Sequence, residues 1–106
     1  MNLPEAISIY FAPLPSKGEA IGRCFTEDAV VKDEGHTYRG LAAIKKWKSE
    51  ASAKYNLTSV PFFSEHRDGK TLVSSRVTGN FPGSPINLRF AFRLIGDKIA
   101  TLEIVA

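Results

Sequence analysis

The fold is decided by residues 24–47, which read CFTEDAVVKDEGHTYRGLAAIKKW. Residues 30–34 and 36–38 have the character of two short strands, and the Glu34-Gly35 pair is typical of a tight bend. A helical pattern then runs over residues 41–55, the clearest in the sequence. We therefore expect a strand pair followed directly by the longest helix.

The helix expected over residues 41–55 has one apolar face. The residues that recur on this face at helical spacing are Leu41, Ile44, Trp47, Ala51 and Tyr55. Such a stripe predicts that the helix packs on a sheet. A solvated helix surface is the ordinary explanation of the charged residues that are expected to face away, Lys45, Lys46, Lys48 and Glu50.

Two shorter helices are expected before the strand pair. The first is predicted by apolar residues at helical spacing, namely Leu3, Ile7, Tyr10, Phe11 and Leu14. Pro13 and Pro15 end it, because proline lacks the N–H group that a helix interior needs. Ser16 and Glu19 form a capping-box pattern for the second helix, on which one face carries Ile21, Cys24 and Phe25.

The second half of the chain is predicted to be an antiparallel meander. Its strands are expected over residues 57–65, 71–78, 86–94 and 99–105, with turns at Asp68-Gly69 and Gly96-Asp97 and a loop over residues 79–85. Pro61 indicates an edge or a bulge in the first of these strands. The predicted fold class is α+β, with three helices in the N-terminal half packed against one face of a mixed, mainly antiparallel sheet.

Composition limits the class of protein. The chain has 106 residues, with 43% hydrophobic and 24% charged residues, which is typical of one globular domain over residues 1–106. A net charge of +3 without a concentrated basic patch argues against nucleic-acid binding. No apolar run is long enough to span a bilayer, and the first ten residues carry no basic region of a secretory signal. We expect a cytoplasmic protein.

Three segments carry a resemblance to a known family: CFTEDAVVKDEG, YRGLAAIKKW and FRLIGDKIATLEI. With the first helix, their order resembles the nuclear-transport-factor-2-like superfamily, and more closely its SnoaL-like polyketide cyclase branch. The resemblance implies a cone formed by a curved sheet, a mostly apolar pocket, and a homodimer through the outer sheet face. The superfamily includes ketosteroid isomerase, polyketide cyclases and proteins without an assigned activity, so the fold alone does not define the function.

The ketosteroid isomerase pattern transfers to this chain in part. Its general-base aspartate ends a run that matches residues 28–33, which places that role on Asp33. Its oxyanion-hole tyrosine matches Tyr10 on the first helix. Phe90 stands where the second oxyanion donor, a protonated aspartate, is found in that enzyme. A phenyl ring donates no hydrogen bond, which argues against steroid isomerisation by that mechanism.

Asp33 is the carboxylate that the strand pattern places in the predicted pocket. It shares a strand face with Val31, and burial among Trp47, Phe90 and Ile44 would raise its pKa towards the range useful for proton abstraction. Tyr10 could donate a hydrogen bond to the carbonyl oxygen of a substrate. Alternatively, Asp33 is a structural strand-end acceptor, and Tyr10 and Trp47 are core residues.

The remaining residues give weaker signals. His36 and His66 lie on different elements and form no cluster with metal-ligand spacing, so neither a metal nor a cofactor is expected. Cys24, between apolar neighbours, is expected to be a small buried residue. Phe81 lies in the loop over residues 79–85, either as a lid over the pocket or as a plug in a dimer contact.

An outer sheet face carrying valines and phenylalanines from residues 60–63 and 73–77 would favour a homodimer.

The predicted function is binding of a small hydrophobic or carbonyl-containing molecule. Proton abstraction of the isomerase, cyclase or dehydratase type is the catalytic form of this hypothesis. The alternative is a non-catalytic ligand-binding or assembly domain.

Overall fold

The computed structural model describes residues 3–11, 17–54 and 58–106. The predictions at Pro13, Leu14, Pro15, Ser16, Tyr55 and Leu57 lie outside these residues. The elements of the described part are the helices α1 (Glu5–Phe11), α2 (Lys17–Cys24) and α3 (Leu41–Lys54), and the strands β1 (Phe25–Asp33), β2 (His36–Arg39), β3 (Thr58–Arg67), β4 (Lys70–Thr78), β5 (Ile86–Ile95) and β6 (Lys98–Val105).

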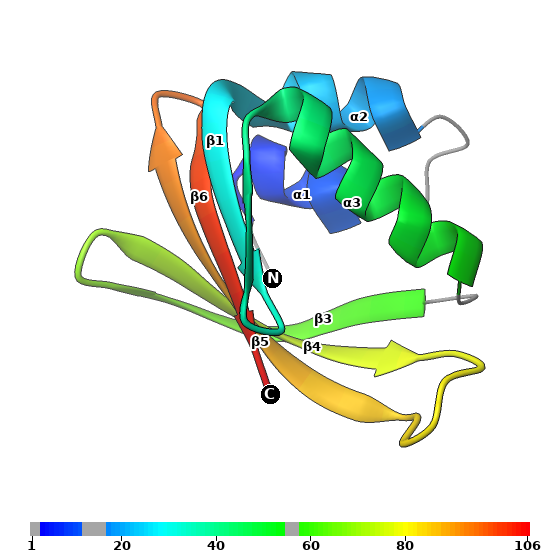
Figure 1. Ribbon diagram of the computed structural model, residues 1–106. Coiled ribbons are helices and arrows are strands. Elements are labelled where there is room, and N and C mark those ends of the chain that lie inside the picture. The colour runs from blue at the N-terminus through cyan, green and yellow to red at the C-terminus, as the bar shows by residue number, and fades with distance from the viewer. Residues whose placement is uncertain (1–2, 12–16, 55–57) are drawn as a thin grey trace.

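The strands form one curved sheet in the order β2-β1-β6-β5-β4-β3. β1 runs parallel to β6, and the other neighbours are antiparallel. The three described helices lie together on the concave side of the sheet, which stays open rather than closing into a barrel (Figure 1). The predicted α+β architecture, helices on one face of a mainly antiparallel sheet, is confirmed.

Two hairpins turn where the sequence predicts it. Asp33 pairs with His36 and Arg67 with Lys70, so each loop has two residues. The first loop residues, Glu34 and Asp68, have φ angles of 51° and 53°, and each is followed by a glycine with positive φ. Such left-handed pairs match the twist of the flanking strands, which is why a residue-glycine pair is a strong hairpin signal.

β1 is longer than predicted. The sequence places Phe25 on the second helix and begins the strand near Val30, whereas the helix ends at Cys24 and the strand begins at Phe25. Phe25 pairs with Ile99 of β6, and the register shifts between Phe25 and Val30. The prediction was wrong because this pairing is made with a strand more than seventy residues away, beyond the reach of local periodicity.

The core lies between the helices and the concave face of the sheet. Apolar and polar residues alternate over residues 86–94, which predicts that Phe90 and Phe92 lie on one face of the strand and Arg89 and Arg93 on the other. This prediction is confirmed in β5, since Phe90 and Phe92 are buried whereas Arg89 and Arg93 are exposed. On β4 the prediction was wrong in part. Val73 and Val77 face the helices and are buried, so they add nothing to the outer surface.

The sheet register defines the row of residues on which the candidate site is built. Asp33 lies beside Ile104 of β6, Ile104 beside Phe90 of β5, and Phe90 beside Val73 of β4. This row lies on the helix-covered face, because Phe90 and Val73 are buried there. A carboxylate at the end of β1 is therefore brought next to an apolar surface formed by the opposite end of the chain.

Candidate active site

Asp33 is the last residue of β1 and is half-buried. The indole Nε1 of Trp47 donates a hydrogen bond to its Oδ2 atom over 3.2 Å. Trp47 reaches this position because it lies one helical turn after Ile44, on the stripe that packs against the sheet. The predicted shared face is confirmed as well, since Val31 is fully buried on the same side of the strand.

The environment of Asp33 raises the pKa of its carboxyl above the usual value. Burial is the largest cause, because it penalises the charged form. The hydrogen bond from Trp47 and the nearby Lys48 act in the opposite direction, whereas the charge of Glu34 adds to the increase. Asp33 is thus a carboxylate of increased basicity whose orientation is fixed by an indole.

Tyr10 lies on α1 and is only 8% exposed. Its ring makes edge-on contacts with four phenylalanines, at centroid distances of 5.1 Å to Phe11, 5.5 Å to Phe92, and 6.1 Å to Phe25 and Phe90. Burial, followed by the charges of Asp33 and Cys24, raises the pKa of Tyr10 far above its ordinary value. Its hydroxyl therefore stays protonated and can act only as a neutral hydrogen-bonding group.

Lys48 contradicts the prediction that it faces solvent. Its side chain is half-buried, and its Nζ donates a hydrogen bond to the Tyr10 hydroxyl over 3.3 Å. The same nitrogen lies 4.3 Å from the centroid of the Tyr10 ring. Burial lowers the pKa of Lys48 to about 8, although Cys24 and Asp33 act to raise it.

A sequence signal for Lys48 exists in the helix periodicity. Leu41, Ile44 and Lys48 are separated by three and four positions, so they lie on one helix face. Grouping Lys48 with Lys45 and Lys46 by charge predicts a solvated side chain, whereas its position on the helix predicts contact with the core. Position is the better guide here, because a lysine can cross apolar surface along its long aliphatic stem.

The structure thus brings four side chains together as two hydrogen-bonded pairs: Trp47 with Asp33, and Lys48 with Tyr10. Of the four, Lys48 is the one that the sequence analysis did not assign to the site. The charge of Asp33 acts on both members of the second pair. The predicted ligand-contact residues Val31, Ile44, Trp47 and Phe90 all belong to the surrounding buried cluster. Phe81 is half-buried in the loop between β4 and β5, and its role as lid or plug stays a prediction.

An open hollow of about 620 Å³ borders Asp33 at the turn between β1 and β2. Its other lining residues include His36, Ile86, Leu88 and Ile104. The predicted wall residues Trp47 and Phe90 are not part of this lining. The hollow therefore gives Asp33 a solvent-facing side, and the enclosed apolar pocket expected around Trp47 and Phe90 stays a prediction.

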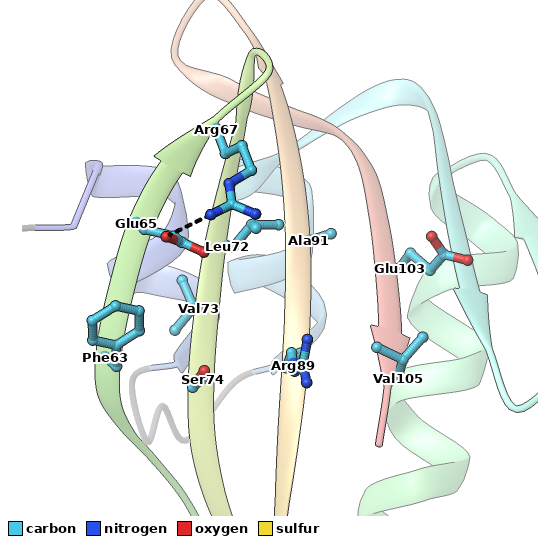
Figure 2. A pocket seen from close by; sticks show the side chains of 10 residues that line it. All are labelled: Phe63, Glu65, Arg67, Leu72, Val73, Ser74, Arg89, Ala91, Glu103 and Val105. Atoms are coloured by element: carbon cyan, nitrogen blue, oxygen red, sulfur yellow. Dashed lines mark ion pairs between the residues drawn. The ribbon is translucent and has the colours of Figure 1, made fainter.

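A second, smaller hollow of about 210 Å³ lies on the outer face of the sheet. Figure 2 shows Phe63, Ser74, Arg89 and Val105 in a row across four strands, which the register confirms. Arg67 forms an ion pair with Glu65 at 3.7 Å beside this row. This face combines exposed apolar groups with charges and lies on the other side of the sheet from Asp33.

The remaining candidate groups are one buried cysteine and two exposed histidines. Cys24 is fully buried, as predicted, and burial raises the pKa of its thiol to about 11, so it is no activated nucleophile. His36 and His66 are both exposed. Within residues 3–11, 17–54 and 58–106, no three histidine, cysteine, aspartate or glutamate side chains are grouped to hold a metal ion. None of the helices described is long and apolar enough to cross a membrane.

Comparison with known proteins shows the family of the chain. No family model and no curated protein matches the chain. Among solved structures, a protein from Sinorhizobium meliloti described as a candidate polyketide cyclase shares 36% identity, covering 97% of this chain and 95% of that chain, with a TM-score of 0.91.

More distant structures share the fold. A protein with a ketosteroid isomerase-like fold from Catenulispora acidiphila, in complex with trimethylamine, has 19% identity and a TM-score of 0.83 over 99% of this chain and 87% of that one. A candidate isomerase of the SnoaL-like family from Agrobacterium tumefaciens has 15% identity and a TM-score of 0.78 over 94% and 92%. Because the Sinorhizobium protein matches in sequence as well as in fold along nearly the whole chain, this protein belongs to the SnoaL-like polyketide cyclase family of the nuclear-transport-factor-2-like superfamily.

Proposed function

We propose that the protein is a cofactor-independent acid–base enzyme acting on a small hydrophobic molecule that contains a carbonyl group. The observation that carries the proposal is the pairing of Asp33 with Trp47, which fixes a carboxylate of raised pKa beside the Tyr10–Lys48 pair. A base of increased strength next to a neutral donor is the arrangement that enolisation requires.

In the proposed reaction, the Asp33 carboxylate removes a proton from the carbon next to the carbonyl group. The electron pair of the broken C–H bond forms a C=C bond, and the carbonyl oxygen takes the negative charge. Tyr10 accepts a hydrogen bond from Lys48, so its own O–H remains available to that oxygen. The positive charge of Lys48 polarises this O–H group, and it partly replaces the second donor that Phe90 cannot supply.

Two comparisons support the proposal without defining a substrate. The Agrobacterium structure of the same fold is described as a candidate isomerase, and the Catenulispora structure is in complex with a small molecule. Reprotonation at a different carbon would give isomerisation, attack of the enolate on a second carbonyl would give cyclisation, and loss of a leaving group would give dehydration. All three outcomes share the first proton transfer, which is therefore the step to measure.

The direct test is deuterium exchange at the carbons next to the carbonyl groups of a panel of small ketones and lactones, followed by NMR in heavy water. We expect exchange catalysed by the wild-type protein, and a rate lower by about 10² in Tyr10→Phe, since one donor to the developing oxyanion is lost. The phenylalanine keeps the aromatic contacts of Tyr10, so the fold is expected to stay intact.

Thermal stabilisation by the same compounds provides the control, because a ligand of the native state raises its apparent stability. Stabilisation by a ketone without any exchange would support the alternative, a non-catalytic ligand-binding domain. Exchange at equal rates in wild type and Tyr10→Phe would remove Tyr10 from the mechanism.

We also propose that two copies associate through the outer sheet face. Phe63 and Val105 line the hollow of Figure 2 and are 53% and 48% exposed. Val60, which is 56% exposed, pairs with the exposed Arg76 of β4 on the same sheet face. Apolar patches of this kind are typical of protein interfaces, and a two-fold axis would place the same patch on both copies.

Phe63→Asp is expected to convert a dimer into a monomer, because the partner copies would then bury unpaired carboxylates. Sedimentation velocity across a concentration series measures the change. Glu50→Lys, on the exposed side of α3, is the matched charge-changing control and should leave the oligomeric state unaltered. A wild-type protein that is monomeric at every concentration would contradict the proposal.

A further inference from the structure

Lys48 has an environment unlike that of Lys45 and Lys46 on the same helix. Lys45 and Lys46 are exposed, and Lys46 pairs with Glu50. The Lys48 amine instead contacts the hydroxyl and the ring face of Tyr10, and lies 5.5 Å from the centroid of the Trp47 ring. It is therefore a nitrogen held among aromatic groups on the covered side of the sheet.

The charge of Lys48 is not neutralised by a close carboxylate. Within the described part of the chain, the ion pairs are Lys46–Glu50 and Arg67–Glu65. The titratable groups that face the amine are Tyr10 from α1, Cys24 at the end of α2 and Asp33 from β1. Of these, Tyr10 and Cys24 are neutral, and the Asp33 carboxylate accepts its close hydrogen bond from the indole N–H of Trp47 rather than from Lys48.

Removing an ammonium group from water without a paired carboxylate costs free energy. An apolar residue at this helix position would avoid that cost. A desolvated amine is also the form in which lysine acts as a nucleophile towards carbonyl compounds, because its neutral state is populated near neutral pH. Burial lowers the pKa of Lys48 to about 8, so about one-tenth of the amine is uncharged at pH 7.

We propose that Lys48 is an imine-forming amine that condenses with a small aldehyde or ketone bound beside Tyr10 and Asp33. This inference shares the site of the proposed function but needs no proton abstraction by Asp33 to occur. The groups of the site define the ligand class. The Lys48 amine requires a carbonyl carbon to attack, and polar hydrogens of the site can bind the carbonyl oxygen.

The chemistry balances without an oxidant, a reductant or a metal. The neutral Nζ attacks the carbonyl carbon, a C–N bond forms, and the carbonyl oxygen takes up the proton that the nitrogen releases. The nitrogen lone pair then forms a C=N bond while the C–O bond breaks. The leaving hydroxyl takes a proton from the solvent and departs as water, leaving an iminium ion whose positive charge lies beside the Asp33 carboxylate.

Acetylacetone, a small diketone, is the probe that tests this proposal. Its condensation with an amine releases water and gives a conjugated enaminone with a new near-ultraviolet absorption band. Peptide mapping by mass spectrometry locates the added mass. At pH 7.5 we expect Lys48 to be labelled at least about tenfold faster than Lys46, whose side chain is 79% exposed, because a pKa of about 8 leaves about a quarter of the Lys48 amine uncharged.

The labelling rate should rise with pH and level off above about pH 8. Lys48→Met and Lys48→Arg are both expected to abolish the fast phase, whereas the matched variant Lys46→Met should keep it. Lys48→Arg retains the positive charge, so it separates loss of the nucleophile from loss of charge. Mapping also separates Lys48 from the chain's α-amino group, which titrates in the same pH range.

If the exposed lysines are labelled as fast as Lys48, the proposal is overturned. This comparison needs only the wild-type protein, so it does not depend on whether a variant folds. The two proposals fail separately. Deuterium exchange without labelling at Lys48 would leave the acid–base function in place and remove the imine. Labelling at Lys48 without exchange would support the imine and remove the proton abstraction by Asp33.

Discussion

Asp33→Asn is expected to reduce the rate of deuterium exchange into small ketones by about 10³, since a positioned general base contributes roughly 10²–10⁴ to such a step. Asparagine has nearly the same shape and can still accept the hydrogen bond from Trp47. A lower exchange rate would therefore be caused by the missing base and not by a displaced Trp47 indole. NMR in heavy water measures the rate, and circular dichroism establishes that the variant is folded.

The pH dependence gives an independent check of the same residue. Because the pKa of Asp33 is raised, exchange should increase with pH as this carboxyl ionises, at values above those of an ordinary aspartate. The contribution of Asp33 to the free energy of unfolding changes with pH in the opposite direction. A group whose pKa is higher in the folded state stabilises the fold at low pH, and this contribution disappears as pH rises through the folded pKa.

Asp33→Asn should accordingly keep or increase the free energy of unfolding at neutral pH, because the substitution removes the cost of a partly buried charge. A variant that loses both exchange and stability would instead favour the structural alternative, in which Asp33 holds the strand end in place. Urea denaturation of wild type and variant at the same pH separates these two outcomes.

Phe92→Ala is expected to destabilise the fold by about 3–5 kcal/mol, the range for removing a large aromatic side chain from a core. Phe92 is fully buried, and its ring centroid lies 5.5 Å from that of Tyr10 and 5.8 Å from that of Phe11. The substitution would leave a cavity under α1, between the helix layer and the sheet. Urea denaturation measures the change in the free energy of unfolding.

Ile95→Ala is the matched control for this prediction. Ile95 ends the same strand and is 66% exposed, so truncating it removes little buried area. Its effect should stay within about 0.5 kcal/mol. Similar losses in the two variants would mean that the centre of β5 is not packed as described.

Some features of the candidate site can be predicted from local sequence, and others cannot. Strand alternation alone predicts that Asp33 and Val31 lie on one face, and the helical stripe predicts the inward position of Trp47. Both signals are local, because each depends on residues within one element. The hydrogen bond between Trp47 and Asp33 was not predictable in this way, since it depends on how α3 crosses the end of β1.

Backbone preferences and periodicity act over a few residues, so the element order, the hairpin at Glu34-Gly35 and the alternation of β5 can be predicted from the amino-acid sequence alone. The start of β1 at Phe25, the inward orientation of Val73 and the contact of the Lys48 amine with Tyr10 are seen only in the folded chain. Each of these depends on contact between segments far apart in the chain. Burial, which changes the pKa of Lys48 and Asp33, exists only once those segments have met.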